Sequence, residues 1–88
     1  MADLVLIVDD DKAVSTMLYK VMGSNGIQAD TADSGEQCLA MLRQKQYDLL
    51  LLDINLSAMD GFQVIQQIRQ NGSKIPIIIV SGRKEDYD

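Results

Sequence analysis

With 88 residues, of which 47% are hydrophobic and 24% are charged, the chain has the length of one domain and is too apolar for a disordered segment. Its net charge of −5 at pH 7 argues against binding to nucleic acids or to anionic membranes, because their phosphates repel an acidic surface. The sequence has no histidine and a single cysteine, which excludes histidine-based catalysis, a histidine zinc site and an internal disulfide.

The first half of the chain predicts a strand, a helix and a second strand. The aliphatic run Leu4–Val8 is long enough for a strand and too short for a helix, and Asp11 is placed to cap the helix that follows. The inward positions of this helix are predicted to be Val14, Met17, Leu18 and Val21. The turn residues at 23–26 end the helix, and residues 27–32 form a weaker, partly polar strand that suits a sheet edge.

The second half repeats this alternation. Ser34 and Gln37 predict a capping box for a helix that runs to about Lys45 with Leu39 and Leu42 inward. Residues 48–53 form a leucine-rich strand. Gly61–Gln70 forms a helix that Asn71 and Gly72 end, with its inward face predicted to carry Phe62, Ile65 and Ile68. Residues 75–80 form a last strand, whose single proline falls near its start.

The order β-α-β-α-β-α-β predicts an α/β fold over one domain, residues 1–88. Continuous aliphatic strands separated by single helices are typical of a parallel sheet that is covered on both faces. We therefore expect a doubly wound sheet with strand order 2-1-3-4, in which the first and third strands are neighbours where the winding reverses. The apolar runs are too short to span a membrane, the N-terminal residues do not resemble a signal peptide, and the single cysteine suits a reducing compartment, so we expect a cytoplasmic protein.

Polar residues follow three of the predicted strands. Asp9 and Asp10 come after the first strand, Asp53 ends the leucine strand, and Ser81 follows the last one. Because the carboxyl ends of parallel strands share one edge, the three aspartates should converge, with Ser81 one strand beyond. Two carboxylates about 5 Å apart repel by roughly 3 kcal/mol, so the cluster predicts a compensating cation. Hard oxygen ligands suit Mg²⁺ better than zinc or copper.

Other candidate residues have structural explanations that are favoured over functional ones. Asp11 is interpreted as a helix cap and Asp60 as a turn or cap residue. Cys38 lies beside Leu39 and Leu42 in a helical pattern, so we interpret it as a packing residue and not as a nucleophile.

Four segments also occur, in order, in a known family. LIVDDD at 6–11, the leucine strand ending at Asp53, MDG at 59–61 and IPIIIVSG at 75–82 closely resemble the receiver domain of bacterial two-component response regulators. The resemblance covers essentially the whole chain. It implies a flavodoxin-like fold, a role in phosphorelay signal transduction, and a domain that is not an enzyme beyond assisting its own phosphorylation and dephosphorylation.

The resemblance implies a role for each site residue. Asp53 would be the phosphoacceptor, forming an aspartyl phosphate, and the Ser81 hydroxyl would contact a phosphoryl oxygen. Asp10 would ligate Mg²⁺ directly, Asp9 would contribute through its charge or a bound water, and the backbone carbonyl of Asn55 would complete the protein ligands. Because the chain has no histidine, the phosphoryl group would come from a partner histidine kinase, a phosphotransfer protein or a small phosphodonor.

The sequence departs from the family in two respects. Ser57 stands where the family usually has proline, and receivers normally continue past residue 88 into a further helix, a fifth strand with a phosphoryl-contacting lysine, and a last helix. A receiver truncated in this way leaves one sheet face and the edge of residues 75–80 uncovered, which predicts a homodimer or an element-exchanged oligomer. It also predicts phosphorylation that is slow or poorly retained. The alternative is that the 88 residues are a segment of a longer receiver.

Two other functional classes compete with a phosphoacceptor. One is an interaction module that binds a partner without being phosphorylated. The other is a haloacid-dehalogenase-like phosphatase, which is disfavoured because that family needs a second acid two residues after the nucleophile and Asn55 stands there. A flavin-binding protein is also disfavoured, because an acidic crevice repels the flavin phosphate.

Overall fold

A computed structural model of the chain describes residues 3–56 and 59–80. The elements alternate as the sequence predicts. In chain order they are β1 (Leu4–Val8), α1 (Lys12–Ser24), β2 (Gln28–Ala32), α2 (Gly35–Gln44), β3 (Leu49–Asp53), α3 (Gly61–Gln70) and β4 (Ile77–Val80).

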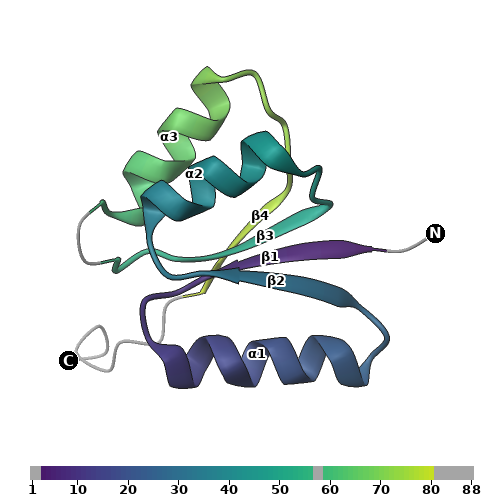
Figure 1. Ribbon diagram of the computed structural model, residues 1–88. Helices are drawn as coiled ribbons and strands as arrows, with labels where there is room; N and C mark the ends of the chain where they lie inside the picture. Colours follow the sequence, from purple (N-terminus) through teal and green to yellow (C-terminus); the bar gives the residue numbers. More distant parts are fainter. Residues whose placement is uncertain (1–2, 57–58, 81–88) are drawn as a thin grey trace.

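The four strands form one parallel sheet in the order β2-β1-β3-β4, which confirms the predicted doubly wound topology. Helix α1 covers one face of the sheet, and α2 and α3 lie side by side on the other (Figure 1). The predicted edge position of β2 is also confirmed. It is the most polar of the four strands, and an edge strand needs only partial burial.

The core has two parts, one on each face, because alternate residues of a strand point to opposite faces. Facing α2 and α3, the central strands contribute Leu6, Val8, Leu50 and Leu52, all at most 1% exposed. The smaller part facing α1 contains Val5, Ile7 and Leu51, against which Leu18 and Met22 pack. Each large aliphatic side chain buried in this way contributes about 1.5–3 kcal/mol to folding.

The helix caps agree with the sequence except at α2. Asp11 caps α1, and Asp60 caps α3 in a capping box with Gln63. At α2 the Ser34 hydroxyl accepts from the Gln37 N–H, as expected, but the Gln37 side chain accepts from the N–H of Asp33 and not from that of Ser34. The predicted capping box is therefore wrong by one residue. The two side chains nevertheless provide acceptors for the N–H groups of Gln37 and Asp33.

Three residues predicted to point inward are exposed. On α1, Met17 is 55% exposed and Val21 46%, and on α3 Phe62 is 67% exposed. Helical spacing identifies an apolar stripe, but the covered part of the stripe depends on which neighbours pack there. On α3 the predicted inward position of Ile68 is confirmed, Ile65 packs partly buried against the core, and the other buried positions are Gly61 and Val64.

Strand β4 forms the second edge of the sheet and is poorly covered. It starts two residues later than predicted, after Pro76, whose carbonyl accepts from the Leu50 N–H. Ile78 is 52% exposed and Ile79 is 47% exposed, on opposite faces of the sheet. The described part of the molecule therefore presents apolar surface on both sides of this edge.

A polar contact joins the amino end of β3 to β2. The Tyr47 hydroxyl donates to Asp30 Oδ2 at 2.7 Å, and Lys45 Nζ donates to the same oxygen at 2.9 Å. The Tyr47 hydrogen bond and then the Lys45 contact hold the pKa of Asp30 below its ordinary value of 3.8. Burial and the nearby Asp30 carboxylate raise the pKa of Tyr47.

We expect Asp30→Ala to lower the free energy of unfolding by about 1 kcal/mol near neutral pH, because the buried Tyr47 hydroxyl loses its acceptor. An acid whose pKa is lowered by folding adds stability above its unfolded pKa, and this stability is lost as the pH falls through the folded value. The difference between wild type and Asp30→Ala should therefore shrink below about pH 4 in urea unfolding curves. Tyr47→Phe is the matched control, and an effect of Asp30→Ala that grows in acid would contradict this explanation.

The single cysteine is a core residue, as predicted. Cys38 is completely buried on the inner side of α2, and burial raises the pKa of its thiol to about 12. Among the described residues, no helix combines the length and the apolar character needed to cross a membrane.

Candidate functional site

Three aspartates meet at the carboxyl edge of the two central strands. Asp9 follows β1 directly, Asp53 is the last residue of β3, and these strands are neighbours in the sheet. Carboxylate oxygens of Asp9, Asp10 and Asp53 all lie within 4.8 Å of one another. The convergence that the strand order predicts is confirmed.

Backbone N–H groups orient two of these carboxylates. Asp9 Oδ1 accepts from the Asp11 N–H at 2.9 Å, and Asp53 Oδ1 accepts from the Asn55 N–H at 3.0 Å. The main chain of Asp9 is fixed as well, because its N–H donates to the Ala32 carbonyl at 3.1 Å. Each carboxylate is thus held by the turn that follows its strand. The side chains need little reorganisation to act together.

Bringing these three carboxylates together destabilises the folded state through burial and charge repulsion. Asp9 is only 6% exposed, and its burial raises the pKa of its carboxyl group above the ordinary value of 3.8. The hydrogen bond from Asp11 opposes this rise, while the negative charges of Asp53 and Asp10 add to it. Two carboxylates about 5 Å apart repel by roughly 3 kcal/mol at an effective dielectric constant near 20.

The donor set fits a hard divalent cation. Asp9, Asp10 and Asp53 offer only carboxylate oxygens, and neither histidine nor cysteine lies in the described cluster. Mg²⁺ binds through one or two carboxylates and keeps several waters, whereas zinc prefers nitrogen and sulfur ligands. A cluster that is half open to solvent, with Asp9 buried and Asp10 exposed, leaves room for such waters.

The structure describes some of the remaining predicted residues and not others. Asp11 and Asp60 are helix caps, as expected, and do not belong to the cluster of Asp9, Asp10 and Asp53. Asn55 is half-buried two residues after Asp53 and contacts it through its N–H, so the use of its carbonyl as a ligand stays a prediction. Ser81 and Ser57 lie outside the described residues.

Gly61 is a positioning residue to which sequence analysis gave no role of its own. Its N–H donates to the Ile54 carbonyl at 3.0 Å, which ties the start of α3 to the residue after Asp53. A Cβ at this position would lie 2.7 Å from Ile54 Cα and 3.1 Å from the Asp53 carbonyl oxygen. Only glycine allows this approach. The signal in the sequence was the glycine directly after the cap residue Asp60.

We expect Gly61→Ala to lower the free energy of unfolding by about 1–3 kcal/mol, because the added methyl group meets backbone atoms that cannot move independently. The amide resonances of Ile54 and Asn55 should shift as well, since the loop behind Asp53 must move. Gly23→Ala is the matched control, because a Cβ there meets nothing within 4 Å. In a helix this control should gain about 0.5–1 kcal/mol. If the two variants had the same free energy of unfolding and neither shifted the amide resonances of Ile54 and Asn55, Gly61 would not position the loop.

Comparisons with known proteins agree with this geometry. Residues 5–88 match the family described as the response regulator receiver domain. The transcriptional regulatory protein AfsQ1 of Streptomyces coelicolor is 39% identical over 83 residues, which are 94% of this chain and 36% of that protein. The alkaline phosphatase synthesis transcriptional regulatory protein PhoP of Bacillus subtilis is 32% identical over 84 residues, 96% of this chain and 35% of that protein.

Solved structures show the same likeness. A response regulator receiver protein from Pseudomonas putida superposes with a TM-score of 0.86 at 32% identity, covering 99% of this chain and 74% of that one. TrrA from Thermotoga maritima, solved in complex with Mg²⁺ and BeF, gives a TM-score of 0.87 at 29% identity, covering 94% and 72%. The chain spans only about a third of the length of the curated relatives it matches. On its sequence, its strand order and its acidic cluster, the chain belongs to the family of response regulator receiver domains.

Proposed function

We propose that the chain is a phosphoacceptor in a phosphorelay, with Asp53 receiving the phosphoryl group. The observation that carries this proposal is the convergence of carboxylate oxygens of Asp9, Asp10 and Asp53 within 4.8 Å at the carboxyl edge of the sheet. In the transfer, an oxygen of Asp53 forms the new P–O bond while the bond between phosphorus and the donor breaks, and the donor keeps that electron pair.

The residues around Asp53 would prepare it for this step. The Asn55 N–H holds Oδ1 and so fixes the rotation of the carboxyl group. Asp9 and Asp10 would hold Mg²⁺, together with Asp53 and the Asn55 carbonyl. When bound, this ion supplies positive charge that offsets the acids and the incoming phosphoryl oxygens. Support comes from the donor set itself and from the similar TrrA receiver, whose structure includes Mg²⁺.

The donor would be a second protein. The 88 residues contain no histidine, so a donor phosphohistidine would lie outside them, and a histidine kinase or a phosphotransfer protein would carry it. Membership in the receiver family supports such a partner, and both partners would act in the cytoplasm. The domain would not be an enzyme on other substrates. Incubation with acetyl phosphate and Mg²⁺, followed by intact mass spectrometry, tests the proposal through the appearance of one added phosphoryl group.

A second proposal concerns self-association. Ile78 and Ile79 of β4 and Met17 and Val21 of α1 are each between 46% and 55% exposed. Pairing the β4 edges of two copies would provide each strand with a partner and would remove apolar side chains on both faces of the sheet from water. Light scattering at micromolar concentration should give the mass of a dimer for wild type and of a monomer for Ile78→Lys. A well-folded wild-type monomer would contradict this proposal.

A further inference from the structure

Strand β2 has one long side without a strand partner. In a parallel ladder, consecutive residues of an edge strand turn their N–H and C=O groups alternately toward the neighbour and away from it. The Gln28 N–H donates to Asp3 and the Ala32 carbonyl accepts from Asp9, so Gln28, Asp30 and Ala32 face β1. Ala29 and Thr31 therefore turn their backbone groups outward. This edge offers two donors and two acceptors to a further strand.

The positions on either side of this short edge are already occupied. The Ile27 N–H donates to the Met22 carbonyl at 2.9 Å, and the Asp33 N–H donates to the Gln37 side chain at 2.8 Å. Within β2, Ala29 and Thr31 are the residues whose N–H groups face outward, and the N–H groups on either side of them already have acceptors. An edge restricted in this way cannot extend into a long intermolecular ladder, but it suits one short extended segment.

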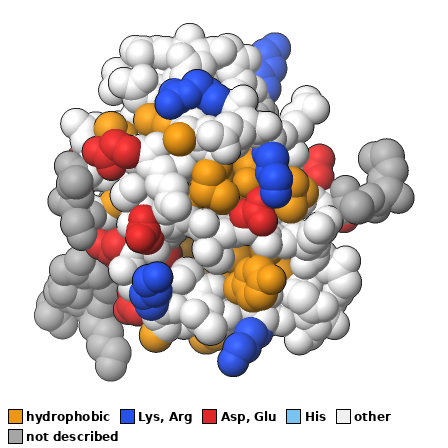
Figure 2. Space-filling view, viewed as in Figure 1, with side chains coloured by type: hydrophobic (Ala, Val, Ile, Leu, Met, Phe, Trp, Pro, Cys, Tyr) orange, Lys and Arg blue, Asp and Glu red, His pale blue; other side chains and the backbone are white. Residues whose placement is uncertain are grey.

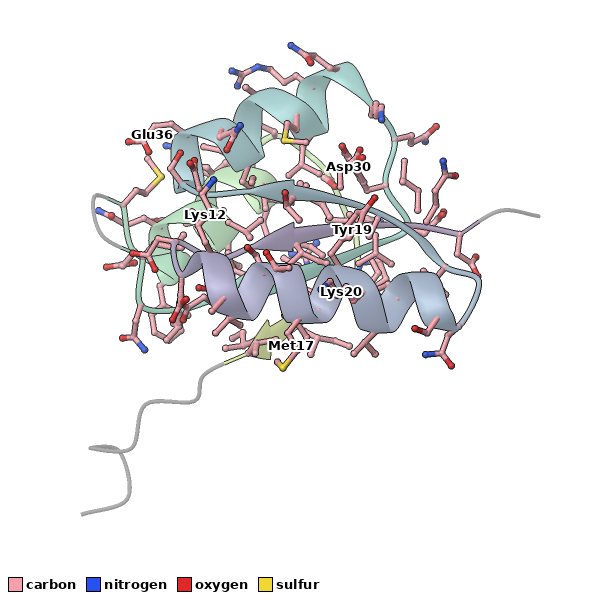
Figure 3. All side chains as sticks on the ribbon, turned by 60° about the horizontal axis from the view of Figure 1, so that its bottom comes forward. Lys12, Met17, Tyr19, Lys20, Asp30 and Glu36 are labelled. Atoms are coloured by element: carbon pink, nitrogen blue, oxygen red, sulfur yellow. The ribbon has the colours of Figure 1, made fainter. Side chains whose placement is uncertain are left out.

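The outward edge lies at the bottom of a groove between α1 and α2. A cavity of about 400 Å³ is lined by Ala29, Asp30 and Thr31 of β2, with Tyr19 of α1 and Met41 of α2 among its walls. A second cavity of about 330 Å³ shares Tyr19 and Thr31 and continues to the carboxyl end of β2. In Figure 3 the Tyr19 side chain points from α1 toward β2, whereas Met17 points to the opposite side of the helix.

The groove combines apolar walls with charges of both signs. Tyr19 is 52% exposed, and Figure 2 shows hydrophobic side chains beside acidic and basic ones on this face. Asp30 and Lys45 neutralise each other in the first cavity. The second cavity is lined by Asp9 and Asp33 against Lys12 alone, so without a cation at the acidic cluster its end carries a negative excess. A basic side chain is the complementary partner there.

We propose that this groove binds an extended segment of a partner protein as an added strand beside β2. The segment runs antiparallel, the more stable pairing, and forms its hydrogen bonds with Ala29 and Thr31. Its side chains alternate between the walls of α1 and α2, and a Lys or Arg near its amino end lies by Asp33. The site is separate from the edge of β4, and the binding does not depend on phosphorylation of Asp53.

A titration with the peptide acetyl-Lys-Val-Thr-Val-Thr-amide tests the proposal, followed by two-dimensional amide NMR of the full chain. The Ala29 and Thr31 amides should show the largest saturable shifts and slower hydrogen exchange, with a dissociation constant on the order of 1 mM. The inward-facing amides of Gln28, Asp30 and Ala32 should exchange as before.

Backbone methylation of the peptide provides the sharpest control, because it leaves the protein unchanged. One peptide carries N-methyl groups on both valines and a second carries them on both threonines. An added strand uses only alternate amides, so one methylated peptide should lose binding and the other should keep it. Equal binding of the two peptides would overturn the proposal, as would shifts that gather at Ile77 and Ile79 of β4.

Protein variants test the same contacts from the other side. Ala29→Pro removes an outward donor without removing a bond to β1, and it should abolish the shifts, whereas Ala29→Val should retain them. Asp33→Asn should weaken binding by about two- to fivefold, as expected for an exposed ion pair. If the amides of Ala29 and Thr31 shift with protein concentration alone, a second copy occupies the groove and the proposal is wrong.

Discussion

Replacing Asp53 by Asn should abolish phosphoryl uptake from acetyl phosphate, because the amide that takes the place of the carboxylate is not a nucleophile for phosphorus. Asn retains the side-chain oxygen that accepts from the Asn55 N–H at 3.0 Å, so the loop should keep its conformation. Intact mass spectrometry in the presence of Mg²⁺ should show one added phosphoryl group on wild type and none on the variant. Alkaline treatment should remove the group, since acyl phosphates hydrolyse readily in base.

Asp3→Asn is the matched control for this experiment. Asp3 is an exposed acid outside the cluster, and its replacement changes the net charge by the same amount. Uptake equal to that of wild type is expected for it. Uptake by Asp53→Asn would place the acceptor elsewhere. No uptake by wild type, with Mg²⁺ binding intact in calorimetry, would favour the alternative of an interaction module that is not phosphorylated.

Replacing Asp9 by Asn should stabilise the protein by about 1–3 kcal/mol in buffer without divalent ions, because one charge leaves a crowded cluster. Burial raises the pKa of Asp9, so this acid begins to reduce stability as the pH rises above its unfolded value, the cost is complete above its folded pKa, and it disappears in acid. The gain of the variant should therefore grow as the pH rises above about 4, opposite in sign to the behaviour of Asp30. Urea unfolding at several pH values measures it.

Adding magnesium should reverse this difference and make wild type more stable than Asp9→Asn. A ligand that binds only the folded state adds about 2.7 kcal/mol of stability at a hundredfold excess over its dissociation constant. Wild type should gain stability on this scale, and Asp9→Asn should gain much less, while Asp3→Asn should respond as wild type does. A wild-type protein whose stability is unchanged by millimolar Mg²⁺ would contradict the assignment of the cluster as a metal site.

The site could be predicted because it depends on features that a sequence displays directly. The aliphatic runs that end at Val8 and Asp53 mark where two strands stop, and the strand order makes these strands neighbours. The fold class alone specifies which strands are neighbours, so no individual long-range contact had to be predicted. The convergence of the aspartates then follows from the geometry of parallel strands.

Features that depend on tertiary packing could not be predicted. Met17 and Val21 belong to the apolar stripe of α1 but are exposed, whereas Leu18, as predicted, and Met22, which was not predicted, pack against the sheet. The contact of Tyr47 with Asp30 joins residues 17 positions apart and leaves no local pattern. The role of Gly61 depends on the position of Ile54, which only the folded loop defines.

The slow or poorly retained phosphorylation that the sequence predicts stays a prediction.

The buried thiol of Cys38 makes the molecule a reporter of its own opening. Thiol reagents attack the thiolate, and a group with a pKa of about 12 inside the core offers almost none to the solvent. Modification therefore requires α2 to leave the sheet, and its rate measures how often that happens. Any ion or partner that holds the strands together should slow this reaction without touching the sulfur.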